Sequence, residues 1–397
     1  MKSYPVSIII PNWNGKHFLK QNMSSVLNQD YPVYSIFLVD NNSNDGSRDY
    51  IRMIQKKHPT KISVIENKTN LGFTGSNNIA VEEIITNEKS KYIVFLNNDV
   101  KVEKEWLSNL ITGFTKESIG IVTSKLLYYY PYQRMTISVD FETEIRGIQI
   151  DDLLYPGLIF SEGFRKKGEP LMLPLKLESG KKYYFAISFK SKKSSTQKIK
   201  VDFVGGPIRI DLGKDRIVFN KAGNKEVKVQ GKYIIQNAGT KFNKDKKLFE
   251  EKKIYEFDHE LKSQIVDAGN GAGMAVRTVL IKNLGSFKKK YFAYGEDTEL
   301  SYRLKVNGFK TKFVANAVGY HYLSGSSGKR ITSTQTFYGS RNRLWFIREY
   351  FGFWQFAYYY LRMVVRTFIW GVKAILDKEA YMYFKSYIKA LLSSLGF

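Results

Sequence analysis

The stretch Tyr92–Val100, with the sequence YIVFLNNDV, constrains the fold of this chain most strongly. Its first five residues are mostly apolar and uncharged, which is typical of a strand buried on both faces. Asn97, Asn98 and Asp99 then end the strand with two amides and a carboxylate. In open α/β sheets, ligands bind outside the carboxyl ends of the strands, and such a group suits a hard divalent cation that holds phosphates. Taken alone, the stretch is explained better as a strand followed by a plain Asn/Asp turn.

Three earlier segments show the same pattern of an apolar strand with a polar end. Together they favour a ligand site over a plain turn. Strands are predicted at 6–10, 34–39 and 62–65, with Pro11 ending the first, and helices are predicted to about residue 28, over 47–57 and after residue 78. Alternating strands and helices indicate a mostly parallel sheet. The strand ends are rich in Asn, Asp and Gly, and several such ends at one sheet edge are what a nucleotide site needs. The polar ends are Pro11–Gly15, Asp40–Gly46 and Asn70–Asn78.

Composition narrows the class of protein. With 397 residues, the chain is long enough for two or three domains. It has no Cys, which excludes disulfides and thiolate metal sites. The formal charge of +25 favours phosphate-bearing ligands or anionic lipid. Nucleic acid is the weakest partner class, because no zinc-finger spacing or RNA-binding aromatic signature is present. The segment Met1–Pro5 lacks the long apolar core of a signal peptide, so a cytoplasmic location is expected.

Four segments together resemble the N-terminal half of family 2 glycosyltransferases. Within them, "Asn-x-Asn-Gly", "Val-Asp-Asn-Asn-Ser" and "Asn-x-Gly-Phe" are similar to the rhamnosyltransferase-like branch of that family. The resemblance implies the GT-A fold, which is an α/β fold with one Rossmann-like nucleotide-sugar domain. It also implies a nucleoside-diphosphate sugar as donor, with uracil and thymine both open as the base. The segments are Val6–Gly15, Val39–Gly46, Asn70–Asn78 and Leu96–Val100.

The resemblance implies a role for each strand end. Asp40 is expected to contact the base or ribose of the donor. The group Asn97-Asn98-Asp99 stands at the family's Asp-x-Asp metal motif, with Asn97 in place of the first carboxylate, so Asp99 is expected to bind Mg²⁺ or Mn²⁺. A flexible cationic loop that contains Lys329 is expected to fold over the diphosphate. The implied donor-binding residues are Pro11, Asn12, Asn14, Asp40, Asn42, Asn70, Gly72, Asn97, Asn98 and Lys329.

The resemblance resumes in the second half of the chain. Gly271 and Ala272 lie in a run of small residues that lets an acceptor approach the backbone. The sequence "Glu-Asp-x-x-Leu-x-x-Arg" at 296–303 matches the family's second acidic motif, which implies that Asp297 is the catalytic base and Glu296 orients the acceptor; the expectation for Arg303 is that it locks these acids in place. His321 matches the family's metal-binding His after the last strand, although a lone His is usually a packed residue. One departure is Lys288–Lys290, where the family often has an acidic pair.

Between these parts, residues from about 160 to 260 show strand alternation without helices, which indicates a β-sandwich. The run "Leu-x-Leu-x-Ser-Gly-Lys-x-Tyr-x-Phe-x-Ile-Ser-Phe" resembles jelly-roll carbohydrate-binding modules. A structural or homo-oligomerisation domain is an equal alternative. The predicted domains are residues 1–127 for nucleotide-sugar binding, 128–262 for the inserted β-sandwich, 263–330 for the acceptor and catalytic part, and 331–397 for a helical tail.

The helical tail is aromatic and basic. No uncharged run within it reaches the roughly 20 residues that a bilayer span needs. Its Lys/Arg stripe and abundant Trp, Phe and Tyr predict amphipathic helices that lie on an anionic membrane surface. The protein is therefore expected to be peripheral on the inner face of the cell membrane, with a glycan on a lipid carrier as acceptor.

These observations predict an inverting, metal-dependent glycosyltransferase of cell-surface polysaccharide or glycoconjugate assembly. The alternative from another class is a non-catalytic glycan-binding protein that uses the inserted sandwich. Asp99, Asp297 and His321 argue against this alternative, because a binding protein needs none of them. A nucleotidyltransferase is a nearer rival, but it would normally show a Gly-rich signature near the first strand, and residues 6–15 contain only Gly15.

Overall fold

The computed structural model describes residues 3–32, 34–87, 90–129, 235–242, 261–322, 332–375 and 378–396, and the backbone of separate strands between 133 and 220 and at 251–252. The chain divides into two compact units, one formed by residues 1–129 and 235–397 and the other by residues 130–234. The second unit thus ends at 234, whereas the sequence pattern placed the end of the insert at 262. The reason is that strand β16 (Ile235–Asn237) pairs with a strand of the first unit.

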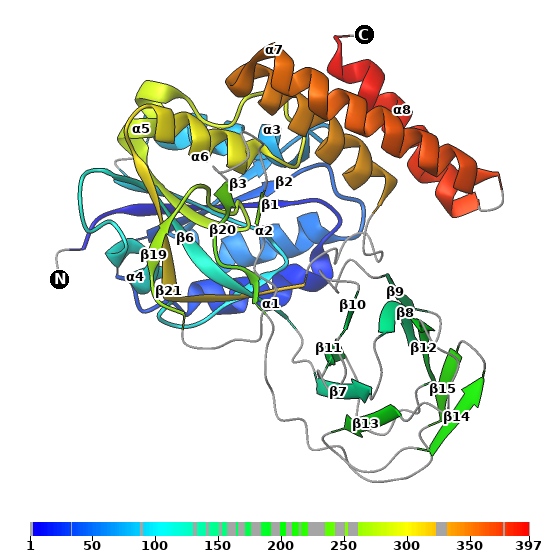
Figure 1. Ribbon diagram of the computed structural model, residues 1–397. Helices are drawn as coiled ribbons and strands as arrows, with labels where there is room; N and C mark the ends of the chain where they lie inside the picture. Colours follow the sequence, from blue (N-terminus) through cyan, green and yellow to red (C-terminus); the bar gives the residue numbers. More distant parts are fainter. Residues whose placement is uncertain are drawn as a thin grey trace. The chain divides into compact units, whose positions relative to one another are not determined.

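The first unit is built on a mixed sheet of ten strands (Figure 1). Eight of them follow the order β19-β21-β6-β20-β4-β1-β2-β3, and the other two, β16 and β5, pair with β6 and β21. Its first half contains β1 (Val6–Asn12), α1 (Lys16–Leu27), β2 (Tyr34–Asp40), α2 (Ser47–Lys57), β3 (Ile62–Glu66), α3 (Gly72–Asn87), β4 (Tyr92–Leu96), β5 (Val100–Val102), α4 (Trp106–Thr112) and β6 (Ile119–Tyr128). After β16 come β17 (Lys241–Phe242), β18 (Glu251–Lys252), β19 (Gln264–Val266), β20 (Gly273–Arg277), α5 (Thr278–Leu284), α6 (Glu296–Val306), β21 (Lys310–His321), α7 (Ser333–Ala374) and α8 (Lys378–Ser394).

Strands β3, β2, β1 and β4 run parallel, which confirms the predicted α/β fold. Strand β1 lies between β2 and β4, so the chain moves outward from β1 in one direction to β2 and β3 and then crosses to the other side for β4. Such a reversal of strand order is where ligands bind in open α/β sheets. Strand β20 is antiparallel to both β4 and β6 and lies between them.

Alternating side chains of the strands supply two hydrophobic cores, one on each face of the sheet. One core joins Ile8, Ile10, Val94 and Leu96 to α1, α2 and α4. The other joins Ile9 and Phe95 to α3, α5 and α6. Because both faces of these strands are covered, residues 8–10 of β1 and 93–96 of β4 are apolar at every position, as the pattern of 92–96 predicts.

Pro11 does not end the first strand, so that expectation was wrong. Strand β1 continues to Asn12, and Pro11 pairs with Val39 of β2. Beyond Ile9, β1 pairs only with β2, because its pairing with β4 ends there. The missing N–H of Pro11 can therefore face the side on which no ladder remains to be broken.

The second unit contains antiparallel strands in two sheets. One sheet has the order β10-β8-β12-β15-β14, with β9 paired to β8, and the other has the order β11-β7-β13. Their bounds are β7 (Gln133–Val139), β8 (Thr143–Ile150), β9 (Leu153–Pro156), β10 (Phe164–Arg165), β11 (Leu171–Leu175), β12 (Tyr184–Ser191), β13 (Ile199–Phe203), β14 (Arg209–Gly213) and β15 (Arg216–Asn220). The sequence alternation that predicts strands continues at 226–230, but these residues lie outside the described ones.

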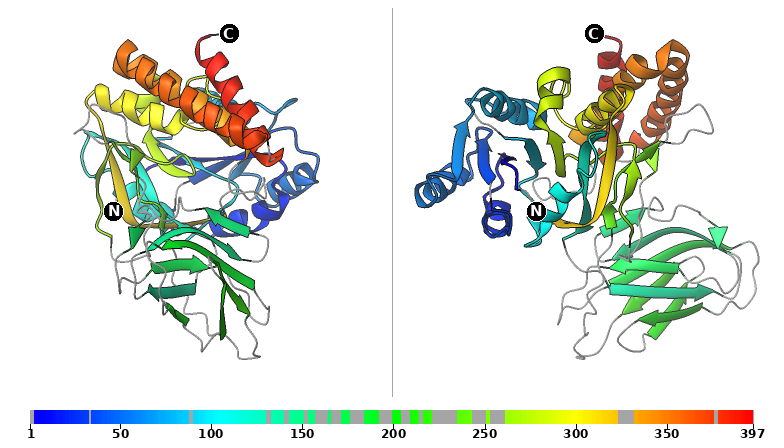
Figure 2. Two further views of the ribbon diagram at one scale, coloured as in Figure 1. Left: turned by 45° about the vertical axis from the view of Figure 1, so that its right-hand side comes forward. Right: turned by 90° about the vertical axis from the view of Figure 1, so that its left-hand side faces the viewer.

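Helices α7 and α8 run side by side in both views of Figure 2. Helix α7 is interrupted at Gly352, whose φ of 81° and ψ of 178° are not helical. Among the described residues, no helix combines the length and the apolar composition that a membrane span requires.

Gly72, the first residue of α3, tests the packing between the two halves of the first unit. Its φ is +71°, and an added Cβ would lie 2.4 Å from the backbone carbonyl oxygen of Phe292. We expect Gly72→Ala to lower the free energy of unfolding by at least about 1–2 kcal/mol, since the left-handed conformation alone costs that much in a residue with a Cβ. Thermal and denaturant unfolding would measure this.

Gly339→Ala is the matched control, because this position in α7 has no atom within 4 Å of the added Cβ. This variant should be as stable as the wild type or more stable, since Ala is favoured over Gly in a helix by roughly 0.5–1 kcal/mol. Equal stability of Gly72→Ala and the wild type would contradict the packing described here.

Candidate active site

Asn12 links the carboxyl ends of β1, β2 and β4. The Asn98 amide donates to Oδ1 of Asn12 at 2.7 Å, and Nδ2 of Asn12 faces Ser43 Oγ at 3.2 Å and Asp40 Oδ1 at 3.4 Å. Asn12 is almost fully buried. Gly15 lies against this group, and a Cβ there would come within 2.1 Å of the Asn98 amide nitrogen. The strand ends that the sequence pattern placed at one sheet edge therefore do meet there.

Asp40 is fully buried and paired within the protein. Its Oδ2 accepts a hydrogen bond from Arg48 Nε at 2.9 Å and another from the Ser43 backbone N–H at 3.0 Å. Asn42 supports the same guanidinium, because its Oδ1 accepts from Arg48 Nη2 at 2.5 Å. Asn14 closes the loop from the other side, donating its backbone N–H to Ser43 Oγ at 2.9 Å. This arrangement fixes the loop after β2, and donor contact by Asp40 stays a prediction.

Asn41 is a site residue that the sequence motif did not single out. Its Oδ1 accepts from the Leu71 backbone N–H at 2.9 Å and from Asn67 Nδ2 at 3.1 Å. Its Nδ2 donates to Asn70 Oδ1 at 2.7 Å and to the Gly72 carbonyl at 3.2 Å. Asn41 thereby ties the loop after β2 to the loop that enters α3. The sequence did contain a sign of this role, because Asn41 lies between Asp40 and Asn42, which were both predicted to bind the donor.

Asp99 and His321 come together although 222 positions separate them in the sequence. Nε2 of His321 lies 3.1 Å from Oδ1 of Asp99. The antiparallel pairing of β21 with β5 produces this contact, because it places His321 opposite Val100. On the other side of the ring, Nδ1 of His321 lies 2.8 Å from Oε1 of Gln236, which belongs to β16.

This pair is suited to a cation. An amide oxygen can only accept, so Nδ1 of His321 donates to Gln236, while Nε2 of the same ring faces Asp99. Apart from His321, no described residue donates a hydrogen bond to Asp99 Oδ1. A ring N–H that binds a carbonyl-type oxygen is the usual support of a metal-binding His, and here it leaves Nε2 directed at a carboxylate, the second kind of ligand that such a cation takes. No set of three His, Cys, Asp or Glu side chains suited to a metal occurs among the described residues.

Asp297 occupies the first turn of α6, where the helix dipole favours a negative charge. Its Oδ2 accepts from the Gly271 backbone N–H at 2.9 Å, and its Oδ1 accepts from the Thr298 backbone N–H at 2.7 Å. Ala272, which follows Gly271 in the chain, accepts a hydrogen bond at its backbone carbonyl from the backbone N–H of Asn97, at 3.2 Å. Two adjacent residues of one loop therefore join the end of β4 to Asp297.

Glu296 is buried beside Asp297, and its Oε2 has no hydrogen-bond partner among the described residues. Burial, reinforced by the negative charge of Asp297, raises the pKa of Glu296 to about 8. The carboxyl group is therefore mostly protonated at neutral pH and can donate a hydrogen bond. The charges of Glu296 and Asp99 also act, after burial, to raise the pKa of Tyr294, whose φ is +71°.

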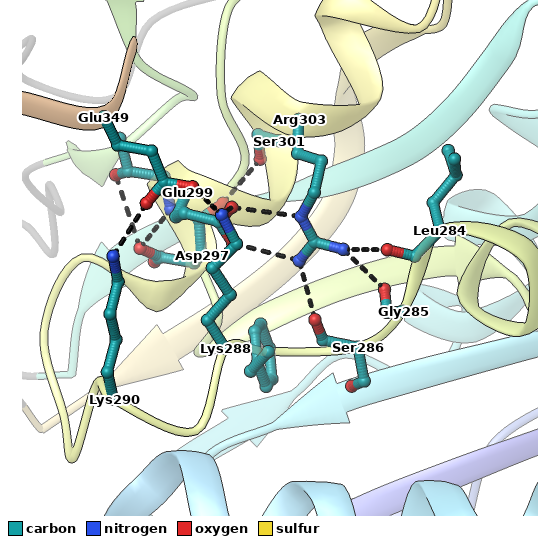
Figure 3. A network of polar contacts seen from close by, with 12 residues as sticks. Leu284, Gly285, Ser286, Lys288, Lys290, Asp297, Glu299, Ser301, Arg303 and Glu349 are labelled. Atoms are coloured by element: carbon teal, nitrogen blue, oxygen red, sulfur yellow. Dashed lines mark hydrogen bonds and ion pairs between the residues drawn. The ribbon is translucent and has the colours of Figure 1, made fainter.

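Arg303 does not lock the two motif acids, so that expectation was wrong. Its guanidinium pairs with Glu299, one turn earlier on α6, through contacts of 2.9 and 3.0 Å (Figure 3). It also donates to the carbonyl oxygens of Leu284, Gly285 and Ser286. The spacing of four residues favours this pair, because residues i and i+4 lie on the same face of a helix.

The basic run before α6 pairs with α7. Lys288 and Lys290 both bind Glu349, the latter at 2.7 Å, and Lys288 also lies 3.0 Å from Glu299 (Figure 3). Tyr350 donates to Glu299 at 2.5 Å. The carboxylate that balances this run is thus supplied by α7, which fixes α7 to the base of α6.

Two family profiles match this chain. The profile described as "Glycosyl transferase family 2" matches residues 7–162, and that described as "Glycosyltransferase like family 2" matches residues 194–348. Together the two matches cover most of the sequence. The chain belongs to glycosyltransferase family 2.

Curated relatives of this glycosyltransferase family member each match about a third of the chain. The glycosyltransferase AglE of Haloferax volcanii is 24% identical over 32% of this chain and 40% of the relative. The Escherichia coli UDP-Glc:alpha-D-GlcNAc-diphosphoundecaprenol beta-1,3-glucosyltransferase WfgD is 28% identical over 28% of this chain and 39% of the relative. The Bacillus spizizenii poly(ribitol-phosphate) beta-glucosyltransferase is 31% identical over 30% of this chain and 18% of the relative. The chain spans less than half the length of the curated relatives it matches.

Two solved structures show a distant likeness to this chain. GalNAc-T7 with UDP, GalNAc and Mn²⁺ is 14% identical, with a TM-score of 0.49 over 87% of this chain and 48% of that protein. The mannosyltransferase PcManGT from Pyrobaculum calidifontis with GDP-Man and Mn²⁺ is 12% identical, with a TM-score of 0.48 over 100% of this chain and 88% of that protein.

In the structure of this family 2 protein, most of the site residues predicted from the sequence lie at the edge of the sheet where the parallel strands end. Asn70 and Gly72 face β2 through Asn41, and Asn97 reaches Asp297 through Ala272 and Gly271. Lys329 and its loop lie outside the described residues. The role of each site residue stays a prediction.

Glu296 gives this glycosyltransferase family member a pH-dependent stability. Folded Glu296 keeps its proton to about pH 8, whereas a Glu in the unfolded chain loses it near pH 4.5. The folded state thus binds more protons between these values, so stability falls as the pH rises through this window. In the wild type, this group makes the free energy of unfolding fall by at most about 1.4 kcal/mol per pH unit. We expect Glu296→Gln to remove this pH dependence, as measured by denaturant unfolding from pH 5 to 8. Glu82→Gln, at an exposed side chain, should keep the wild-type slope; the same slope in Glu296→Gln would contradict the buried neutral acid.

Proposed function

We propose that this protein transfers a sugar, with inversion, from a nucleoside-diphosphate sugar to a hydroxyl group of a glycan acceptor. One observation carries the proposal: the loop Gly271–Ala272 connects the end of β4, which bears Asp99, to Asp297 on α6. A donor held at the strand ends would therefore have its leaving group near Asp99 and His321. The acceptor hydroxyl would be near Asp297, as transfer with inversion requires.

In this mechanism, Asp297 takes the proton of the acceptor hydroxyl as that oxygen attacks the anomeric carbon. The backbone N–H groups of Gly271 and Thr298 hold the carboxylate in place for this step. The protonated carboxyl of Glu296 next to it can donate a hydrogen bond to an acceptor oxygen, which orients the acceptor. The anomeric centre should carry oxocarbenium character in the transition state.

Asp99 and His321 would hold Mg²⁺ or Mn²⁺, with Gln236 fixing the ring of His321. Bound there, the cation would supply positive charge against the charge that builds up on the leaving diphosphate. Asn97 has a buried Oδ1 without a partner among the described residues, which leaves it available to a sugar or ribose hydroxyl.

The family and the names of the relatives support a proposal for the substrates. The name of the E. coli relative describes a UDP-glucose donor and a diphosphoundecaprenol-linked acceptor, which supports a UDP- or dTDP-linked donor and a lipid-linked glycan here. Rhamnose fits the motif resemblance of the first strands. Such an acceptor implies work at the inner face of an anionic membrane, in the assembly of a cell-surface glycan. For the unit 130–234 we propose a role in glycan binding or self-association.

Replacing Asp297 by Asn tests the base. The shape and the Gly271 contact can persist, but the proton acceptor is lost, so transfer should fall by about 10²–10⁴-fold while donor affinity holds. Transfer is measured by release of nucleoside diphosphate with acceptor present, and donor affinity by calorimetry. Asp49→Asn makes the same change in the first turn of α2 and should leave transfer unchanged. Near-normal transfer by Asp297→Asn would refute the assignment.

Binding of Mn²⁺ to the protein without donor tests the metal site. We expect Asp99→Asn and His321→Gln to abolish it, and Gln236→Leu to weaken it by about 10–100-fold, since it removes the support of the ring. Electron paramagnetic resonance of free Mn²⁺ measures the bound fraction. His17→Gln, at a surface His, is the control. The metal role fails if the three site variants bind Mn²⁺ like the wild type, or if transfer is unaffected by EDTA.

A further inference from the structure

The outer face of α7 exposes a continuous apolar stripe after the break at Gly352. Its members recur at alternating spacings of four and three residues, which places them along one side of the helix. Their exposed fractions range from 42% for Tyr358 to 83% for Trp354. The stripe consists of Trp354, Tyr358, Leu361, Val365, Phe368, Val372 and Ile375.

This stripe is not the surface that joins α7 to its neighbour. The buried residues Phe356 and Met363 of α7 form a core with Ala390 and Leu391 of α8. The side chains that hold the helix pair together are therefore already accounted for. A contiguous exposed apolar surface that is bordered by polar residues marks an interaction site. Helix α8 and the residue that follows it add further exposed apolar side chains: Tyr381, Met382, Ile388, Leu392 and Leu395.

Cations border the apolar stripe. Arg362, Arg366 and Lys373 are exposed on α7, and Lys385 and Lys389 are exposed on α8. Some lie over aromatic rings of the same helices: Arg362 lies 5.6 Å from the centre of the Tyr358 ring. The sequence from 350 to 376 contains no Asp or Glu. This surface is therefore apolar and exclusively cationic over its length on α7.

Charge decides between two occupants. The heptad-like spacing alone would fit a helix of a second copy. A second copy would bring Arg362 and Arg366 to an equally cationic stretch that has no acid to pair with them, in a chain of formal charge +25. The exposed Val364 and Ile369 also make the apolar face wider than the narrow a/d stripe by which two helices pair in a coiled coil. An anionic bilayer offers both an apolar interior for the stripe and phosphates for its cationic border.

We propose that α7 beyond Gly352, together with α8, lies flat in the headgroup region of an anionic lipid bilayer. The stripe residues enter the acyl boundary, and Arg362, Arg366 and Lys373 remain at the phosphates, as long basic side chains do. The exposed Trp354 and Phe353 are aromatic side chains of the kind enriched at that depth. The inference identifies the surface that would contact the membrane named above, and it stands whether or not the protein transfers a sugar.

Vesicle sedimentation of the full chain tests the surface. Vesicles of equal parts phosphatidylglycerol and phosphatidylcholine should bind the protein, and vesicles of phosphatidylcholine alone should bind it far less, with a decrease on adding salt. Leu361→Gln combined with Phe368→Gln should weaken binding by at least about tenfold. Arg362→Gln combined with Arg366→Gln should weaken it about tenfold or more at low salt only.

The matched control is Val279→Gln combined with Val306→Gln, which removes two equally exposed apolar side chains from α5 and α6. It should bind vesicles like the wild type. Circular dichroism confirms folding of each variant, and donor hydrolysis without lipid reports on the sugar-transfer proposal separately. Equal binding by the stripe variant and the wild type would overturn the inference. So would a dimer, seen by analytical ultracentrifugation without vesicle binding, that the stripe variant dissociates.

Discussion

The site depends on one short piece of backbone, the loop Gly271–Ala272. Strand β20 enters between β4 and β6, and the loop before it carries hydrogen bonds in two directions. Ala272 accepts from Asn97 and Gly271 donates to Asp297, so the strand that bears Asp99 and the helix that bears Asp297 are fixed to each other. A Cβ on Gly271 would come within 3.2 Å of the Phe73 ring, which explains the small residue.

The buried acids fall into two groups. Asp40 and Glu299 are fully buried and paired with Arg48 and Arg303, and these pairs stabilise the loop after β2 and the helix α6. Glu296, by contrast, carries a carboxyl oxygen without a hydrogen-bond partner among the described residues, and the partly buried Asp99 faces the ring of His321 at 3.1 Å rather than an Arg. Because leaving a buried polar atom unpaired costs about 1–3 kcal/mol, such atoms persist where a ligand or a reaction uses them. Acids that are paired with Arg therefore support the structure, whereas Asp99 and Glu296 are the acids available to a ligand.

Helix α7 has a different role on each side of Gly352. Before the break, Glu349 and Tyr350 contact Lys288 and Glu299, and Asn342 donates to the carbonyl oxygens of Ala293 and Tyr294 just before α6. After the break, the helix exposes the apolar and cationic surface described above. The residue that permits the change of direction is a Gly with φ of 81° and ψ of 178°, a backbone conformation that essentially only Gly adopts.

Local pattern determined the elements of the first unit: the apolar runs at 6–10, 34–39 and 92–96, the polar ends that follow them, and the helix that begins at Glu296. These follow from side-chain periodicity and turn chemistry, which act between near neighbours. Only the tertiary structure decided the continuation of β1 past Pro11, the insertion of β20 between β4 and β6, and the support of His321 by Gln236. It also assigned Arg303 to Glu299 rather than to the motif acids. The physical reason is that these choices depend on which distant strands and side chains meet, and the periodicity of a segment carries no record of its partner.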